Sequence, residues 1–396
     1  MYREEKTLRI LYCSTALSFG GEQKQMVQIL SNLDQEHFQP IVCCIRQFEY
    51  VEQTIRDLAT KFVCLQVQNR YNLPAAIRRL RQVIKEQDID LIHMGIFGSN
   101  FAGLLTAMIT GVPAVAILQT SYNLKTRSAM MSAKSATWYF KWRTIHMIHA
   151  ILARIVKVHY VALSQAIKES AVRDMGLPPE RVTVIPLGLK PEEYDERPVH
   201  QEAAKRVRDE LCLDGAYPIL LNVARLLPMK GQKELIQVMP RVLERFPQAK
   251  LLIAGDGPSL SELKQIRDNL GLQEQVLTLG NRDDIGALLQ ASDVFVFGSY
   301  YEGLPGAVIE AMAAGKPVVA FDIPSLRLVV QDGYSGSLIQ GRDVEQFAKA
   351  IVDMAEHRDV AQNMGERARW IVKKDYDIRQ NMRSLESLYR ELLTPV

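Results

Sequence analysis

The chain has 396 residues, of which 47% are hydrophobic and 23% charged; this composition is typical of a soluble globular protein and excludes a disordered chain. Its length predicts two domains, each with its own core. The net charge is only +3, and the longest nearly uncharged stretch, residues 101–122, contains Gly103, Gly111 and Pro113, which predicts a helix, a turn and a strand rather than a membrane span.

The first half of the chain alternates short β-branched segments with amphipathic helical ones. Strands are expected at LRILYC, PIVCCIR, FVCLQV, DLIHM, PAVAIL, HYVALS and RVTVIPLG. Strands separated by helices predict parallel βαβ units and a doubly wound sheet. Residues 1–190 are therefore expected to form an N-terminal Rossmann-like domain.

A second α/β series follows the charged, proline-bearing stretch at residues 190–198, which is the expected linker. Its strands are expected at YPILLNVA, AKLLIAG, QVLTLG, DVFVFGS and PVVAF. Residues 191–375 are predicted to be a second Rossmann-like domain, and the helical pattern in 376–396 is predicted to return to the first domain. A ligand is expected in the cleft between the two sheets, beyond the carboxyl ends of their strands.

One strand, loop and helix junction in the second domain carries two carboxylates. An apolar strand ends at Gly298, Glu302 lies in the following loop, and Glu310 lies about one turn into a helix that opens near Gly306. The start of such a helix presents backbone N–H groups to a phosphate or a sugar hydroxyl. A carboxylate accepts hydrogen bonds from vicinal hydroxyls, so the pair suits a ribose and a hexose; a glutamate placed for the helix dipole is the structural alternative.

Two cations follow the first strand of the same domain. In NVARLLPMKGQKEL the strand ends at Ala224, and Arg225 and Lys230 lie in the loop before the next helix. Charge-assisted contacts from such cations stabilise a departing diphosphate. A solvated basic loop is the alternative reading, but both loops are expected at one edge of one sheet, which favours a shared site.

These motifs resemble glycosyltransferase family 4. The likeness rests on the glutamate pair with seven residues between, on Arg225 with Lys230-Gly231, and on LLIAGDGP, LTLGNRDDIGALLQASDVFVFGSYYEGLP, the Gly20-Gly21 turn and HYVALSQAIKES…RVTVIPLG. It implies two Rossmann-like domains of the GT-B type, residues 1–190 for the acceptor and residues 191–375 for the donor, and a retaining, metal-independent glycosyltransferase. The donor would be a nucleoside diphosphate sugar, UDP or GDP being favoured, and the acceptor a hydroxyl that is lipid-linked or belongs to cell-surface glycan synthesis.

The resemblance also implies roles for individual residues. Glu302 would contact the donor sugar, Glu310 the ribose, and Arg225 with Lys230 the diphosphate. Further donor-binding positions are Gly20, Gly21, Gly280, Asn281, Ser299, Gly303, Leu304, Pro305 and Gly306. Gln119 stands where the family usually has a histidine near the transferred sugar, and glutamine does not titrate. His93, at the end of DLIHM, is expected at the cleft edge on the acceptor side.

Two other functions remain open from the sequence. One is a nucleotide-sugar epimerase of the same architecture, which would form a new sugar nucleotide from the donor alone. The other is an inactive donor-binding partner subunit, which Gln119 makes conceivable. No Asp-x-Asp pair follows a strand, and the five cysteines lack paired spacing, so neither a metal nor another cofactor is expected.

Charge is distributed unevenly along the chain. Residues 1–190 carry 23 lysines and arginines against 14 aspartates and glutamates, and no acidic residue occurs from Leu91 to Lys168. In residues 122–157 the cations are interleaved with Trp138, Tyr139, Phe140 and Trp142, a pattern typical of helices that bind anionic lipid, although a core helix with solvated lysines fits as well. We expect a cytoplasmic protein, peripheral on the inner face of the membrane, that does not bind nucleic acid.

Overall fold

The computed structural model describes residues 7–16, 21–46, 52–67, 72–95, 97–119, 136–186 and 188–394. Its contacts divide the chain into unit 1, Met1–Leu187 with Ile378–Val396, and unit 2, Gly188–Asp377. The divisions therefore fall at 187/188 and 377/378. Within the described residues, no helix combines the length and the apolar character needed to cross a bilayer.

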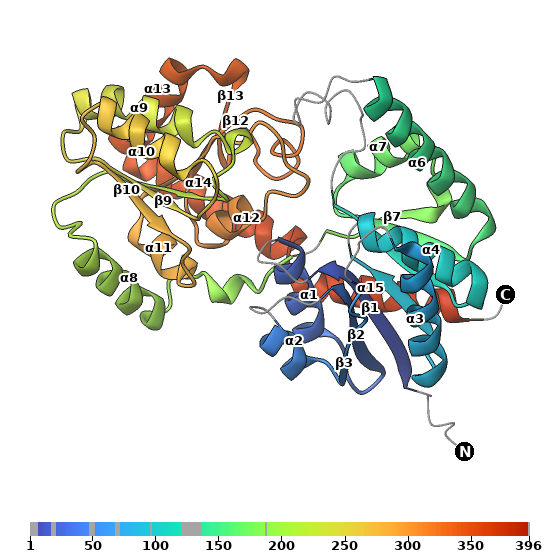
Figure 1. Ribbon diagram of the computed structural model, residues 1–396. Helices are drawn as coiled ribbons and strands as arrows, with labels where there is room; N and C mark the ends of the chain where they lie inside the picture. Colours follow the sequence, from blue (N-terminus) through green and yellow to red (C-terminus); the bar gives the residue numbers. More distant parts are fainter. Residues whose placement is uncertain are drawn as a thin grey trace. The chain divides into compact units, whose positions relative to one another are not determined.

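The described part of unit 1 forms a seven-stranded parallel sheet in the order β3-β2-β1-β4-β5-β6-β7 (Figure 1). The strands are β1 (Leu8–Ala16), β2 (Phe38–Arg46), β3 (Lys61–Cys64), β4 (Leu91–Met94), β5 (Ala114–Leu118), β6 (Val158–Ala162) and β7 (Val182–Val184). The order reverses between β1 and β4, so the loops that leave these neighbouring strands diverge. Such a switch point opens a crevice at the carboxyl edge of the sheet.

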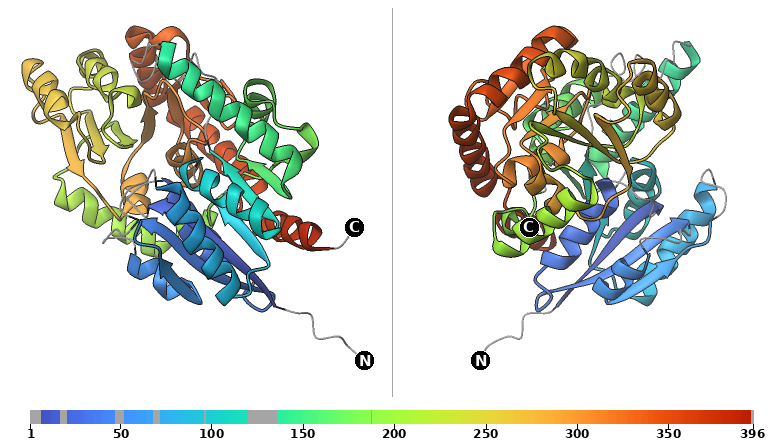
Figure 2. Two further views of the ribbon diagram at one scale, coloured as in Figure 1. Left: turned by 45° about the vertical axis from the view of Figure 1, so that its right-hand side comes forward. Right: turned by 90° about the vertical axis from the view of Figure 1, so that its left-hand side faces the viewer.

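The helices of unit 1 include one from the far end of the chain. They are α1 (Gly21–Asn32), α2 (Glu52–Leu58), α3 (Leu73–Glu86), α4 (Phe97–Thr110), α6 (Ala136–Ile155), α7 (Gln165–Met175) and α15 (Ile378–Leu393). The C-terminal α15 packs beside α1, so the red end of the chain lies among blue elements (Figure 2). Tyr389 of α15 is fully buried against Phe38 of β2, which ties the last helix into the core of unit 1.

Unit 2 contains a six-stranded parallel sheet in the order β10-β9-β8-β11-β12-β13. Its strands are β8 (Ile219–Val223), β9 (Lys250–Ala254), β10 (Val276–Gly280), β11 (Val294–Phe297), β12 (Val318–Phe321) and β13 (Gly336–Ile339). Its helices are α8 (Pro198–Glu210), α9 (Gln232–Arg245), α10 (Leu260–Asn269), α11 (Ile285–Ala291), α12 (Gly306–Ala313), α13 (Val344–Glu356) and α14 (Arg358–Asp375).

The alternation of side chains along the strands gives unit 2 two cores. Leu221 and Phe295 face a layer formed by α8, α11, α12 and α14, whereas their neighbours Leu220 and Val294 face α9, α10 and α13. Strands buried on both faces must be apolar at nearly every position, which explains runs such as ILLNV and VFVF. Both units are doubly wound α/β folds, as the sequence predicted.

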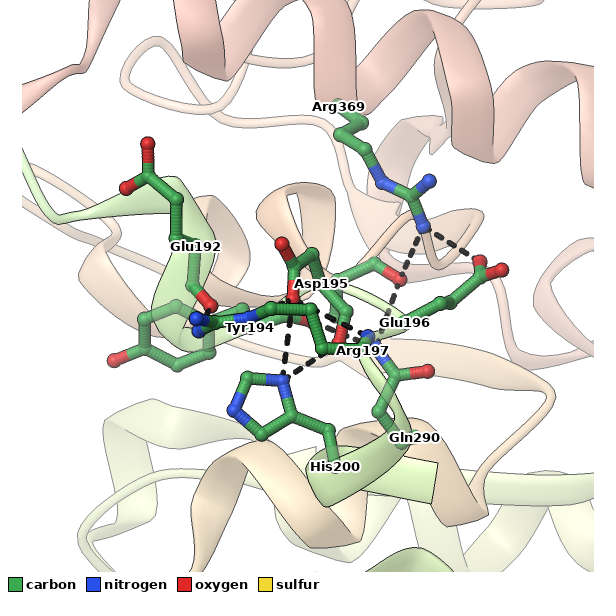
Figure 3. Close-up of polar contacts among 9 residues, drawn as sticks. Glu192, Tyr194, Asp195, Glu196, Arg197, His200, Gln290 and Arg369 are labelled. Carbon is green, nitrogen blue, oxygen red and sulfur yellow. Dashed lines mark hydrogen bonds and ion pairs between the residues drawn. The ribbon is translucent and has the colours of Figure 1, made fainter.

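Residues 192–200, near the start of unit 2, are held to the rest of unit 2 by polar contacts (Figure 3). Arg369 of α14 donates to Glu196 at 2.7 Å, and the Gln290 amide of α11 donates to the carbonyl of Tyr194 at 2.6 Å. The His200 ring contacts the Asp195 carbonyl at 2.7 Å. The predicted linker is thus an ordered part of unit 2.

Candidate active site

The strand order of unit 2 places the two predicted donor loops next to each other. The sheet reverses direction between β8 and β11, which are paired. The loop after β8 carries Arg225 and Lys230, and the loop after β11 carries Ser299 and Glu302. These loops leave a switch point, where ligands bind in open α/β sheets.

The two loops are joined by an ion pair. The Lys230 Nζ lies 2.5 Å from Glu302 Oε1, and these side chains are only 19% and 12% exposed. The buried Ser299 donates its hydroxyl to the same carboxylate oxygen at 2.7 Å. Arg225 is exposed at the start of its loop. Unit 2 thus brings a lysine, a glutamate and a serine together, and the loop of the lysine begins with an exposed arginine.

Backbone contact between the loops requires glycine. A Cβ added to Gly231 would lie 1.9 Å from the carbonyl oxygen of Gly298, and Gly231 has a φ of +66° that other residues adopt at a cost. The amide of Tyr300 donates to the carbonyl of Met229 at 2.9 Å. The Lys-Gly pair of the motif therefore fixes the distance between the lysine loop and the glutamate loop.

Gln232 is a site residue that the sequence analysis missed. It is 1% exposed at the start of α9, and its amide donates to the carbonyl of Arg225 at 3.1 Å. The contact closes the loop that runs from Arg225 to Gly231. The signal in the sequence was only its position directly after the Lys230-Gly231 pair.

Glu310 lies on α12 and is 7% exposed. Tyr194, near the start of unit 2, is also buried. Burial, and to a smaller extent the negative charge of Glu310, raise the pKa of the Tyr194 phenol. Pro305 occupies the N-cap of α12, and Gly306 begins the helix. The helix start and both carboxylates therefore belong to one continuous segment, as expected.

The remaining predicted donor residues of unit 2 lie at the end of β10. Gly280 has a φ of +66° and accepts a hydrogen bond from the amide of Gly255 at 2.7 Å. Asn281 follows it and is exposed. Because β9 and β10 run parallel to β8, these residues lie at the same carboxyl edge as the Arg225 loop.

One predicted residue of unit 1, Gln119, contacts the helix that begins at Gly21. Gln119 directly follows β5, and its amide donates to Oε1 of Gln25 in α1 at 3.1 Å, one turn beyond Gly21, the first residue of α1. Gly20 lies outside the described residues. Gln119 is thus held against the helix that follows the Gly20-Gly21 turn.

The structure corrects the placement predicted for His93. The side chain is 3% exposed, its ring lies 4.9 Å from that of Tyr12, and Nδ1 lies 2.5 Å from the hydroxyl of Tyr389. Burial lowers its pKa to about 3. His93 is a neutral packing residue between β1 and α15, not a residue of an exposed acceptor edge.

Within the described residues, one group of three side chains has the spacing of metal ligands: Asp34, Glu36 and His37. His37 and Asp34 form an ion pair at 2.6 Å, and the Asp34 amide donates to Glu386 of α15 at 2.9 Å. These contacts account for the group as part of the packing between β2 and α15.

Two family models match the chain, one on each half. The model "Glycosyl transferases group 1" matches residues 204–370, and the model "Glycosyltransferase Family 4" matches residues 19–193. The first range contains all six strands of the unit 2 sheet, and the second contains strands β2 to β7 of the unit 1 sheet. The chain is a glycosyltransferase of the GT-B fold and belongs to the group 1, family 4 glycosyltransferases.

Relatives with named activities support this assignment. The chain is 24% identical over 392 residues, 98% of its length and 97% of the relative's, to the Escherichia coli UDP-Gal:α-D-GlcNAc-diphosphoundecaprenol α-1,3-galactosyltransferase. It is 24% identical to the α-D-kanosaminyltransferase of Streptomyces kanamyceticus, over 80% of each chain.

Solved structures share the fold. One is Anabaena HepE in complex with UDP-glucose, with a TM-score of 0.81, 22% identity and coverage of 96% of this chain and 100% of that one. Another is WaaG, a glycosyltransferase involved in lipopolysaccharide biosynthesis, with a TM-score of 0.73, 17% identity and coverage of 96% and 99%.

Proposed function

We propose that this enzyme transfers a sugar from a nucleoside diphosphate sugar, UDP-linked by preference, to a hydroxyl of a lipid-linked acceptor, with retention of anomeric configuration and without a metal ion. The observation that carries the proposal is the Lys230–Glu302–Ser299 cluster at the switch point of unit 2, with Arg225 exposed in the same loop as Lys230. A UDP-sugar is supported by HepE, whose structure holds UDP-glucose. A lipid diphosphate acceptor is supported by the galactosyltransferase of Escherichia coli.

The donor would be bound by charge and by hydroxyl recognition. Arg225 and Lys230 would neutralise the diphosphate, and the N–H groups at the start of α12 would contact a phosphate or sugar oxygen. Glu310, buried on α12, would accept from the ribose hydroxyls, and Glu302 from the transferred sugar. Residues 303–306 lie between the two glutamates and would face the sugar and the phosphates. Gly280 and Asn281 would lie beside the base of the nucleotide.

Retention and metal independence form one mechanism. The bond between the anomeric carbon and the diphosphate oxygen breaks, and the acceptor oxygen forms its bond to carbon on the same face. The departing phosphate oxygen takes the acceptor's proton. Lys230 and Arg225 supply the positive charge that a divalent ion would otherwise provide, and Gln119 would donate a hydrogen bond near the transferred sugar.

The proposal includes peripheral binding to the inner, cytoplasmic face of a membrane. Eight lysines and arginines and no acidic residue occupy Leu91 to Lys168. A cation near an anionic surface adds about 1 kcal/mol of attraction. A lipid-linked acceptor would then be reached without a membrane-spanning segment.

The test is a panel of nucleoside diphosphate sugars, first by thermal shift and then by turnover with a lipid diphosphate sugar acceptor. The preferred donor is expected to raise the melting temperature because it binds only the folded state, and the product is expected to keep the donor's anomeric configuration by NMR. Arg225→Ala is expected to lower turnover at least about tenfold. An inverted product excludes the retaining mechanism, and a new sugar nucleotide formed without acceptor indicates an epimerase instead.

A further inference from the structure

Exposed apolar side chains are concentrated on two neighbouring helices of unit 1. Six large apolar residues of α4 and α6 are between 44% and 76% exposed: Met108, Ile109, Phe140, Met147, Ile151 and Ile155. We call these six residues the apolar face. Helices α4 and α6 contact each other, and α6 lies at the surface of unit 1 (Figures 1 and 2). The other large apolar residues that are exposed in the described chain are scattered over unit 2.

The exposed residues of α6 form one stripe along the helix. Phe140, Met147, Ile151 and Ile155 follow at spacings of seven, four and four, so at 3.6 residues per turn they lie within roughly 80° around the axis. His149 and Ala153 lie on the opposite side and are buried. The helix is therefore apolar on both sides, with its inner side in the core and its outer side in the solvent.

The borders of this stripe are basic. Arg143 and Arg154 are exposed on one flank of the stripe, and Lys157 is exposed just beyond the C-terminal end of α6. Asp90 is the last acidic residue before this region and Glu169 the next after it. An apolar strip bordered by cations is the pattern of a helix that lies in the interface of an anionic bilayer.

We propose that the apolar face is inserted into an anionic lipid bilayer, with its side chains among the upper acyl chains and the flanking cations at the headgroup phosphates. The inference rests on the proposed function and deepens it, because attachment by cations alone is lost as salt rises, whereas burial of apolar surface is not screened. A second copy of this chain fits the face less well, because two such faces would bring like charges together.

The experiment measures co-sedimentation of the full chain with vesicles of phosphatidylcholine alone and of phosphatidylcholine mixed with phosphatidylglycerol, at low and high salt. The test variant is Met147→Gln/Ile151→Gln, which keeps good helix formers at both exposed positions. The matched control is Val199→Gln/Val360→Gln, which removes two exposed apolar side chains of helices in unit 2.

Wild type and control are expected to bind the anionic vesicles and to keep part of this binding at high salt. The test variant is expected to bind at least about tenfold more weakly at high salt, because two inserted side chains are lost. Equal binding by the test variant and the control overturns the proposal, as does a wild type that ignores both vesicles. A wild-type dimer that the test variant converts to a monomer, with unchanged vesicle binding, assigns the face to self-association and also overturns it.

Fluorescence provides a second measurement of insertion. In a variant with Trp138→Phe, Trp142→Phe, Trp370→Phe and Ile151→Trp, the single tryptophan lies in the exposed stripe of α6. Lipids brominated on their upper acyl carbons are expected to quench this emission; vesicle binding without quenching would show surface attachment only and overturn insertion. Donor turnover with a water-soluble acceptor, measured without vesicles, is expected to be equal in all variants. If wild type shows no donor turnover, the proposed function is refuted. The vesicle measurements still decide whether the apolar face is inserted into the bilayer.

Discussion

Replacement of Lys230 by methionine separates two roles of this lysine. The variant keeps most of the side chain's length but removes the charge that lies 2.5 Å from Glu302. Without a bound donor, the Glu302 carboxylate then loses its ion pair with Lys230 and keeps the hydrogen bond from the Ser299 hydroxyl. Lys230 is expected to hold Glu302 at rest and to bind the donor diphosphate during catalysis.

The magnitude follows from the burial of the pair. A hydrogen bond to a charged group contributes about 1.5 to 3 kcal/mol, and with 19% and 12% of the side chains exposed we expect about 1 to 2 kcal/mol of lost stability after partial screening. For a domain of this size, each kcal/mol shifts the melting temperature by about 2 to 4 °C. Glu302→Gln in the same chain removes the unpaired charge, so the double variant should be more stable than Lys230→Met alone.

The assay combines calorimetry with the rate of nucleoside diphosphate release from the preferred donor. The Lys230→Met variant is expected to lose at least about tenfold in kcat/KM, which is about 1.4 kcal/mol, and the double variant is expected to recover stability but not rate. Lys233→Met, an exposed lysine of α9, is the control and should change neither. Wild-type kinetics in Lys230→Met would remove the diphosphate assignment, and recovery of rate in the double variant would show that Lys230 acts only on Glu302.

Three further predictions concern the carboxylates, the metal and the buried histidines. Glu310→Gln is expected to raise the donor's KM, because ribose is held equally in the ground and transition states, whereas Glu302→Gln should lower kcat; the opposite pattern would mean that their roles are exchanged. Full activity is expected in excess EDTA, and loss of activity restored by Mn²⁺ or Mg²⁺ would contradict the metal-independent mechanism. Burial lowers the pKa of His93 to about 3 and that of His149 to about 4, below the value near 6.5 in the unfolded chain. As pH falls below about 6, only the unfolded chain therefore takes up these two protons. For each histidine, the free energy of unfolding of unit 1 should fall by about 1.4 kcal/mol per pH unit. Urea unfolding of Trp370→Phe, followed by the fluorescence of the two tryptophans that remain in unit 1, measures how the free energy of unfolding depends on pH. His149→Leu should make this dependence less steep. An unchanged pH dependence in His149→Leu would show that burial of neutral His149 is not one of its causes.

The exposed stripe on α6 shows how far a sequence pattern reaches. The sequence placed a basic, aromatic segment at residues 122–157 and left open whether its apolar residues belong to a core or to a surface. Helical periodicity alone does not tell which side of a helix meets the sheet. The packing of α6 decides this, because it buries His149 and Leu152 and leaves Met147 and Ile151 in the solvent.

The sequence by itself determined the two doubly wound units, since apolar strands that alternate with helices have few other ways to bury their surfaces. It also determined that Glu302 and Glu310 share one local strand, loop and helix, because both lie within the short segment that runs from β11 to the end of α12. Only the tertiary structure paired Lys230 with Glu302, 72 positions apart, and brought Tyr389 to His93, 296 positions apart. The prediction for His93 was wrong for that reason: a strand-end histidine is exposed or buried according to what packs on it, and the helix that covers it comes from the other end of the chain.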